Sequence, residues 1–183
     1  MVLFILCVKA DLEGVSSMSL KKPVNLCISV KNPLSDFENR EKIILSTEQY
    51  IEQEENSREP PCHFALKWEG SKKRSTIEVL LDEATAKSAL KKSGGSKKSS
   101  RNPPRDVVAT DSGGDFVPVL ALECRGIEPY AFYPMSDEFV VTSEGGTIFN
   151  EGVDLSDGDW ADYDADNDMS VSISNFQSKF VVA

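Results

Sequence analysis

The stretch of the 183-residue sequence with the most obvious chemical potential is a run of aspartates near its end. Its members are Asp154, Asp157, Asp159, Asp162, Asp164, Asp166 and Asp168. Clustered carboxylates attract hard cations, and the first three ligand positions of an EF-hand loop are met when the loop is started at Asp162. Its sixth position, however, is Asn167 instead of glycine, and its twelfth is Ile173 instead of glutamate. The spacing excludes an EF-hand and leaves a weak surface cation site open.

Thiol and imidazole chemistry is the second possibility. The four cysteines, Cys7, Cys27, Cys62 and Cys124, form no CxxC or CxxxC pair, which favours reduced, buried thiols with packing roles. Cys62 stands beside His63, the sole histidine, but adjacent residues rarely aim both side chains at one metal. We therefore predict no metal ligands, no catalytic residues and no cofactor, while weak metal binding by Cys62 and His63 stays open.

Motifs of the common enzyme classes are missing from the sequence. It has no glycine-rich phosphate loop, no Gly-x-Ser-x-Gly elbow and no HExxH helix. A single histidine also limits acid–base chemistry near neutral pH. These absences predict a protein that is not an enzyme.

The net charge of −10 hides a sharp division along the chain. Residues 87–105 carry seven basic and no acidic side chains, whereas residues 106–183 carry two basic and sixteen acidic ones. The basic stretch could be a nucleic-acid arm, an anchor for acidic partners or a solvated linker. It lacks stacking aromatics and is rich in Ser and Gly, so we predict a flexible linker and no nucleic-acid partner.

Short β-branched or alternating apolar runs on either side of that linker predict strands. The expected strands are Phe4–Val8, Val24–Val30, Glu41–Leu45, His63–Trp68, Thr76–Leu81, Phe116–Cys124, Phe139–Thr142, Val171–Ser174 and Phe176–Val182. Asp82–Lys92 has helix-favouring residues for two or three turns at most. No apolar run is long enough to span a bilayer, so we predict no membrane partner.

The predicted fold is all-β or mainly β: a β-sandwich or barrel-like single domain of two related halves, with one long flexible insertion and little helix. The first half covers residues 1–86, the basic linker 87–115 and the second half 116–183. A faint internal echo supports related halves, because Leu12-Glu13-Gly14 ends one apolar run as Ile127-Glu128-Pro129 ends another.

The second half contains an unusual series of motifs. They are Glu123-Cys124-Arg125-Gly126-Ile127-Glu128-Pro129, Phe132 and Pro134, Gly146-Thr147-Ile148-Phe149, Trp160-Ala161-Asp162-Tyr163-Asp164, Ser170-Val171-Ser172-Ile173 and Phe180-Val181. In this order and spacing the chain resembles the eukaryotic CXXC-motif-containing zinc-binding protein family. The likeness covers nearly the whole chain but is specific only after residue 116.

The resemblance implies a β-rich domain whose first half carries two CxxC pairs around a four-thiolate zinc. This chain departs from the family at both pairs. The first should fall within Lys31–Ser35 and the second within Lys67–Arg74, and neither segment has a cysteine. Loss of a structural zinc requires replacement contacts, and we expect Trp68 to fill part of the space.

Ten residues of the retained motifs are candidates for an interaction surface or a structural role. They are Glu123, Cys124, Arg125, Gly126, Glu128, Pro129, Trp160, Asp162, Tyr163 and Asp164. Arg125 is the only arginine of the second half, and we expect it to pair with Asp162 or Asp164. That pair would tie the Glu-Cys-Arg-Gly turn to a loop formed by the Trp-x-Asp-Tyr-Asp motif.

Three function classes remain after this reading. The favoured one is a non-catalytic interaction or structural module with an unidentified protein partner, acting as a monomer or weak dimer. The alternatives are a metal-handling protein that uses other ligands and an unrecognised enzyme. Because no targeting signal is evident, we expect the protein in the cytoplasm, with the nucleus as a second compartment.

Overall fold

A computed structural model of the chain describes residues 1–51, 60–80, 108–109 and 116–183. Within these residues the structure is built from strands and turns, with no helix, which confirms the mainly β prediction. The strands are β1 (Val2–Glu13), β2 (Val15–Leu20), β3 (Asn25–Lys31), β4 (Asn39–Ser46), β5 (Phe64–Leu66), β6 (Ser75–Leu80), β7 (Val108–Ala109), β8 (Val117–Arg125), β9 (Glu128–Tyr133), β10 (Phe139–Ser143), β11 (Ile148–Phe149), β12 (Trp160–Asp164) and β13 (Met169–Val182). A search of the same residues finds no helix able to cross a bilayer.

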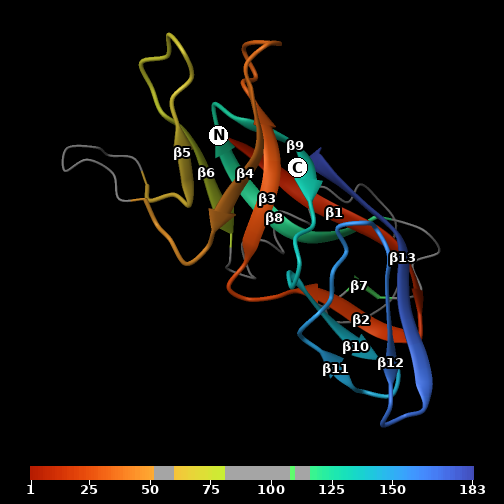
Figure 1. The fold of residues 1–183 in the computed structure, drawn as a ribbon. Helices are drawn as coiled ribbons and strands as arrows, with labels where there is room; N and C mark the ends of the chain where they lie inside the picture. The colour runs from red at the N-terminus through yellow and green to blue at the C-terminus, as the bar shows by residue number, and fades with distance from the viewer. Residues whose placement is uncertain (52–59, 81–107, 110–115) are drawn as a thin grey trace, which may run out of the picture.

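The strands form three curled sheets (Figure 1). The largest has the order β12-β13-β1-β8-β6-β5, and the smaller two have the orders β11-β10-β2-β7 and β4-β3-β9. Each strand from β1 to β6 has a counterpart seven numbers later, from β8 to β13. Exchanging the counterparts turns the order of the large sheet into its own reverse and the β4-β3-β9 sheet into β11-β10-β2. The single domain therefore has two halves related by an approximate twofold, as predicted.

The glycine after the first strand of each half marks this relationship. Gly14 follows β1 and Gly126 follows β8, and their φ angles are 66° and 65°. Each lies against the last strand of the other half: a Cβ on Gly14 would approach the carbonyl oxygen of Ser170 in β13 to 2.3 Å, and one on Gly126 would approach Ser75 Oγ in β6 to 2.7 Å. The echo seen in the sequence reflects two sharp corners at equivalent places.

Some strands differ from their predicted form. β2, β9 and β12 were not expected, because their outward positions carry Ser, Glu, Tyr and Asp, which obscure a period of two. The predicted break between two C-terminal strands is instead a β-bulge at Asn175 in a continuous β13, where φ is 53°. Trp68 lies beyond the end of β5 and not within it.

Apolar side chains from all three sheets fill one core. Its fully buried members include Leu6, Val8, Val15, Met18, Leu26, Ile28, Ile77, Leu122, Phe139, Val141, Leu155 and Ile173. Inner positions alternate with outer ones along β10, as expected for a strand with one face on the core. All four cysteines are buried thiols, as their sequence surroundings predicted.

The prediction of a flexible linker over 87–115 falls mainly outside the described residues, as does the short helix expected over Asp82–Lys92. Within the linker range the structure describes β7, which pairs with β2 through Ser17 and Ala109. The predicted domain boundaries stay predictions.

The corner at Gly14 provides a test of the architecture. Gly14→Ala should destabilise the fold by about 3 kcal/mol or more, because left-handed φ alone costs about 1 to 2 kcal/mol and the new Cβ also meets the Ser170 carbonyl. Gly70→Ala is the matched control, since Gly70 has φ of 72° but nothing within 4 Å of its Cβ position. Chemical denaturation of both variants measures the difference; equal losses would show that the close approach at Gly14 is relieved.

Candidate functional site

The two groups of motif residues lie at opposite ends of the large sheet. Val2 pairs with Cys124 at one end of β1, whereas Leu12 at the other end pairs with Ile173, which in turn pairs with Trp160. Ten residues of strand separate these points, or roughly 30 Å at about 3.3 Å per residue. The retained motifs therefore do not form one surface.

The expected pairing of Arg125 with Asp162 or Asp164 is wrong. Arg125 instead donates to the Oε1 atom of Glu123, two residues away on β8, at 2.7 Å. Glu123 stands opposite Glu78 across the β6–β8 pair. Burial, and next the Glu123 charge, raise the pKa of Glu78, while Arg125 lowers it. Arg125 is thus needed at its own end of the sheet, where it offsets two neighbouring carboxylates.

Other residues of the β8–β9 corner have structural positions. Cys124 is buried, and burial together with the charge of Glu123 raises the pKa of its thiol to about 12. Glu128 forms an exposed ion pair with Lys31 at 3.2 Å, and Pro129 is buried against β3. These side chains join β9 to β3.

The Trp-x-Asp-Tyr-Asp motif forms β12 and not a loop. Trp160 is buried, its Nε1 atom donates to the carbonyl of Gly152 at 3.1 Å, and its ring meets Phe149 edge-on. Asp162 and Tyr163 are exposed, and the Tyr163 hydroxyl donates to Asp168. Together with Ala161 they form the solvent-facing part of the motif.

Asp164 is the centre of a buried hydrogen-bond network. Its carboxylate accepts bonds from Ser143 Oγ at 2.5 Å, Thr147 Oγ1 at 2.8 Å and Asn167 Nδ2 at 2.8 Å. Burial alone would raise the pKa of Asp164, but these hydrogen bonds together lower it to about 2. The network fastens the β10–β11 turn to the β12–β13 turn.

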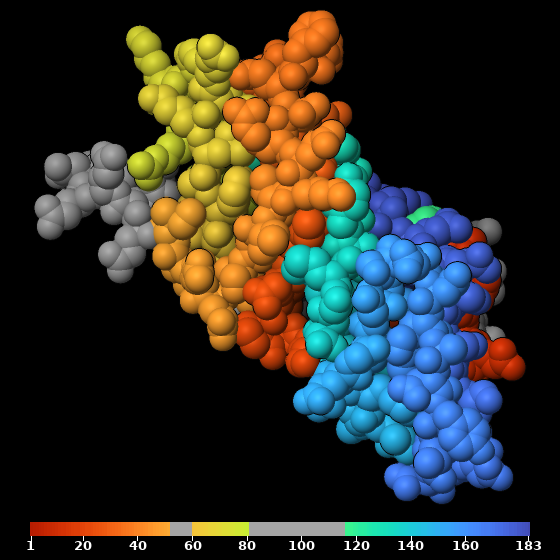
Figure 2. All heavy atoms as spheres, viewed as in Figure 1, coloured from red at the N-terminus to blue at the C-terminus, as the bar shows by residue number. Residues whose placement is uncertain are grey.

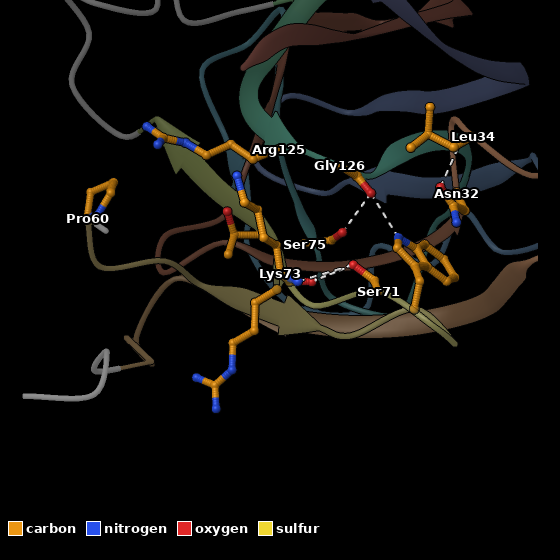
Figure 3. Close-up of a pocket in the computed structure, with 11 residues that line it drawn as sticks. Asn32, Leu34, Pro60, Ser71, Lys73, Ser75, Arg125 and Gly126 are labelled. Carbon is orange, nitrogen blue, oxygen red and sulfur yellow. Dashed lines mark hydrogen bonds between the residues drawn. The ribbon is translucent and has the colours of Figure 1, made fainter. Parts of the chain in front are cut away.

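The equivalent turns of the first half are the β3–β4 and β5–β6 connections, which contain the segments where the two CxxC pairs were expected. The structure brings them together around a cavity of about 380 Å³ (Figure 3). Its lining residues are Asn32, Leu34, Pro60, Trp68, Ser71, Lys73, Arg74, Ser75, Thr76, Arg125 and Gly126. The candidate site is this meeting point of the two connections.

Glu38 joins the two connections in the way that Asp164 joins their counterparts. Its Oε2 atom accepts from Asn32 Nδ2 at 2.6 Å, and its Oε1 atom accepts from the backbone N–H of Glu69 at 3.1 Å. The backbone N–H of Asn32 also donates to the Glu38 carbonyl at 2.8 Å. One carboxylate therefore bridges the β3–β4 and β5–β6 connections, a role that nothing in the sequence indicated.

Trp68, which we expected to fill part of this space, makes the second link at this end and is 3% exposed. Its indole Nε1 atom donates to the carbonyl of Gly126 at 2.8 Å, and Ser75 Oγ donates to the same oxygen at 2.7 Å (Figure 3). The Arg40 guanidinium lies over the ring, 5.6 Å from its centre. In the other half the carbonyl of Gly14 accepts from the N–H of Glu144 at 2.9 Å. At both corners the glycine carbonyl oxygen is therefore the atom that accepts the fastening hydrogen bond.

Comparison with known proteins decides the family. The family profile described as CXXC motif containing zinc binding protein, eukaryotic, matches residues 5–181. The chain belongs to this family. Curated relatives include the UPF0587 protein CG4646 of Drosophila melanogaster, 45% identical over 71 residues, which are 39% of this chain and 43% of that protein. The human CXXC motif containing zinc binding protein is 36% identical over 67 residues, which are 37% of this chain and 41% of that protein.

Solved structures show the same fold over the full length. A hypothetical protein from Plasmodium falciparum superposes with a TM-score of 0.76 at 24% identity, covering 99% of this chain and all of that one. The crystal structure of C1orf123 gives a TM-score of 0.77 at 20% identity, with 99% of each chain covered. The sequence matches to curated relatives, by contrast, span less than half of those proteins.

The residues at the candidate site differ in chemistry from the thiolates that the family name implies. Neither connection contains a cysteine or histidine. The polar side chains that meet there are the Asn32 amide and the Glu38 carboxylate, which form a hydrogen bond with each other. Among the described residues, no three His, Cys, Asp or Glu side chains converge where they could hold a metal ion. This donor set does not fit a four-thiolate zinc site.

Cys62 and His63 lie away from this meeting point, beside the β5–β6 pair. Cys62 pairs with Ile51 through an isolated antiparallel β-bridge of their backbones, and His63 Nδ1 accepts a hydrogen bond from the Val79 N–H at 2.9 Å. The ring centres of His63 and Tyr50 lie 4.3 Å apart. The Nε2 atom of His63 has no hydrogen-bond partner, and burial lowers the pKa of the imidazole. His63 is therefore a neutral, buried histidine that accepts a backbone hydrogen bond within this family member.

Glu138 is a further buried carboxyl that sequence reasoning missed. Its Oε2 atom accepts from the Met135 N–H at 2.8 Å, and its Oε1 atom has no partner. Burial raises the pKa of Glu138 to about 7, although the Met135 bond opposes that shift. Its sequence position before the apolar strand β10 gave no sign of burial, because burial here depends on the packing of the β9–β10 turn.

Asp164→Asn should lower the melting temperature at neutral pH, because the amide cannot accept all the hydrogen bonds that the carboxylate receives. The wild-type advantage should shrink as pH falls from about 3.8 towards 2, where the folded carboxylate takes up its proton. Thermal melts across this range test the effect, with the exposed Asp162→Asn as control. A constant difference at every pH would contradict the low pKa of Asp164.

Glu138→Gln should have the opposite effect. Between pH 4.5 and about 7 the folded carboxyl stays protonated while the unfolded one ionises, so wild-type stability should fall as pH rises through this window. The variant removes this loss and should gain up to about 3 kcal/mol at pH 7 and above. Denaturation at several pH values measures it; a variant that is less stable at pH 8 would rule the assignment out.

Proposed function

We propose that this chain is a non-catalytic interaction module of the CXXC zinc-binding family in which hydrogen bonds close the first-half site without zinc. The observation that carries the proposal is the Glu38 carboxylate, which bridges the two connections where the family's CxxC pairs would lie. Each oxygen of this carboxylate already accepts one hydrogen bond, so a metal ion would have to compete with the Asn32 amide and the Glu69 N–H for it.

The second half supports this reading through its symmetry. There the Asp164 network fastens the equivalent two turns using side-chain oxygens and nitrogens alone. Structural zinc typically contributes about 10 kcal/mol or more of apparent binding free energy in small metal-dependent domains. In this chain the large shared core already holds the turns in place, so burial of Trp68 and the bridging carboxylate are sufficient replacements.

The chemistry of the described nucleophiles supports a non-catalytic role. Burial raises the pKa of Cys7, Cys27 and Cys124, which keeps these thiols protonated and poorly nucleophilic. His63 is buried and its pKa is lowered by that burial. The described thiols and the imidazole are thus placed for packing.

The partner we propose is a protein, and the chain is a monomer or weak dimer in the cytoplasm, with the nucleus as a second compartment. Four buried thiols suit a reducing environment. Exposed aromatic residues such as Tyr163 and Tyr130 offer the amphipathic surface that is common at protein interfaces.

The absence of zinc is testable on the protein purified without a histidine tag. Elemental mass spectrometry should find no stoichiometric zinc, and treatment with a chelator should leave the melting temperature unchanged. One tightly held zinc per chain, with a lower melting temperature after chelation, would overturn the proposal and favour a metal-handling function.

The bridging role of Glu38 gives a second test. Glu38→Ala should destabilise the fold by about 1 to 2 kcal/mol, because a partly buried and an exposed hydrogen bond to a carboxylate are lost. Glu41→Ala, an exposed residue of β4, is the control and should change stability by less than about 0.5 kcal/mol. Equal effects of the two changes would show that the bridge is not a stabilising contact.

A further inference from the structure

The β3–β4 connection ends in two unusually exposed apolar side chains. Leu34 is 93% and Phe37 is 94% exposed, more than any other large hydrophobic residue in the described part of the chain. In Figure 2 this connection and the β5–β6 connection project from one end of the molecule as two neighbouring lobes. The apolar side chains are therefore carried on a convex tip, where Leu34 also lines the mouth of the cavity between the two connections.

The tip is held in shape by hydrogen bonds at its base. Asn32 accepts from the N–H of Leu34 at 3.0 Å through its side chain and from the N–H of Ser35 at 3.1 Å through its carbonyl. The Glu38 carbonyl and carboxylate close the other side of the loop on Asn32. Because the backbone is fixed in this way, Leu34 and Phe37 are presented to solvent by a defined turn.

The charge of the neighbouring connection is opposite to that of the protein as a whole. Residues 67–74 carry four basic side chains against one acidic, and Lys72, Lys73 and Arg74 are all exposed. Residues 150–168, at the end of the molecule that carries β11 and β12 (Figure 1), have eight acidic side chains and no basic one. Positive and negative charge are thus separated along the length of the molecule, and the apolar tip lies at the basic end.

We propose that this end docks on an anionic phospholipid surface, with Leu34 and Phe37 entering the headgroup region while Lys72, Lys73 and Arg74 contact lipid phosphates. Reversible attachment to a bilayer needs two such weak signals together, an apolar one and a basic one. The acidic far end would be repelled and would turn the tip towards the surface. Asp36, between the two apolar residues, limits the depth to the interface.

This inference goes beyond the proposed function and does not depend on it. The sequence predicted no membrane partner because no stretch could span a bilayer, whereas docking requires only the tip of a loop. A convex tip favours a lipid surface over a protein partner, because two protruding side chains would need a matching apolar socket, while lipid headgroups adapt to their shape.

Flotation of the full-length chain with lipid vesicles tests the proposal. Binding should be strong to vesicles of phosphatidylcholine with phosphatidylserine, weak to phosphatidylcholine alone, and weaker at high salt. Leu34→Ser with Phe37→Ser should weaken binding by roughly tenfold or more. Ile148→Ser is the matched control, because Ile148 is 63% exposed on β11 at the acidic end and should leave binding unchanged.

A charge variant separates the basic loop from general attraction. Lys73→Ala should weaken binding roughly fivefold, because each basic residue near an anionic surface contributes about that factor. Lys22→Ala removes the same charge from an exposed site at the other end of β3 and should have no effect. Melting temperatures of all variants confirm that they fold.

Three results would overturn the proposal. They are no binding to phosphatidylserine vesicles, equal binding to both vesicle types, and full binding by the Leu34→Ser, Phe37→Ser variant. The last would assign lipid attraction to other basic residues, such as those of 87–105, and would leave the tip as a surface for a protein partner. None of these results bears on the metal content, so the two proposals fail separately.

Discussion

The rest of this structure depends on one constraint: at each end of the large curved sheet, two turns that are far apart in sequence must be joined. β1 and β8 pair at the centre, and each half then folds its remaining strands outward and returns. A carboxylate closes each end: Asp164 in the second half and Glu38 in the first. Relatives are described as zinc binding, and we propose that at the first end of this chain a hydrogen-bonded acid stands where the resemblance led us to expect zinc.

The carboxylate that closes one end of the sheet could be recognised in the sequence, and the one that closes the other end could not. The two also differ in how deeply they are buried. Asp164 belongs to a recognisable motif, although its role was misjudged because Arg125 lies at the far end of the sheet. Glu38 sits in an ordinary polar hairpin, and only the fold brings it to Glu69. Contacts between segments far apart in sequence carry no local signal.

The fold itself was largely predictable, because alternating and β-branched runs identify strands whose inner faces form the core. The exceptions are informative: β2 and β12 have outer faces rich in serine or aspartate, so only two residues of each are buried. Trp68 was singled out from the need to replace a metal, but its burial is seen only in the structure. Glu138 was missed because its burial comes from a turn and not from a periodic pattern.

Hydrogen exchange of the Trp68 indole N–H in chelator-treated protein tests the central claim most directly, because that proton donates to the Gly126 carbonyl at the closed end. The account predicts a protected, slowly exchanging proton without any metal, and faster exchange in the Glu38→Ala variant. Fast exchange in the wild-type protein that becomes slow only when zinc is added would contradict it, since the first half would then need a metal to close.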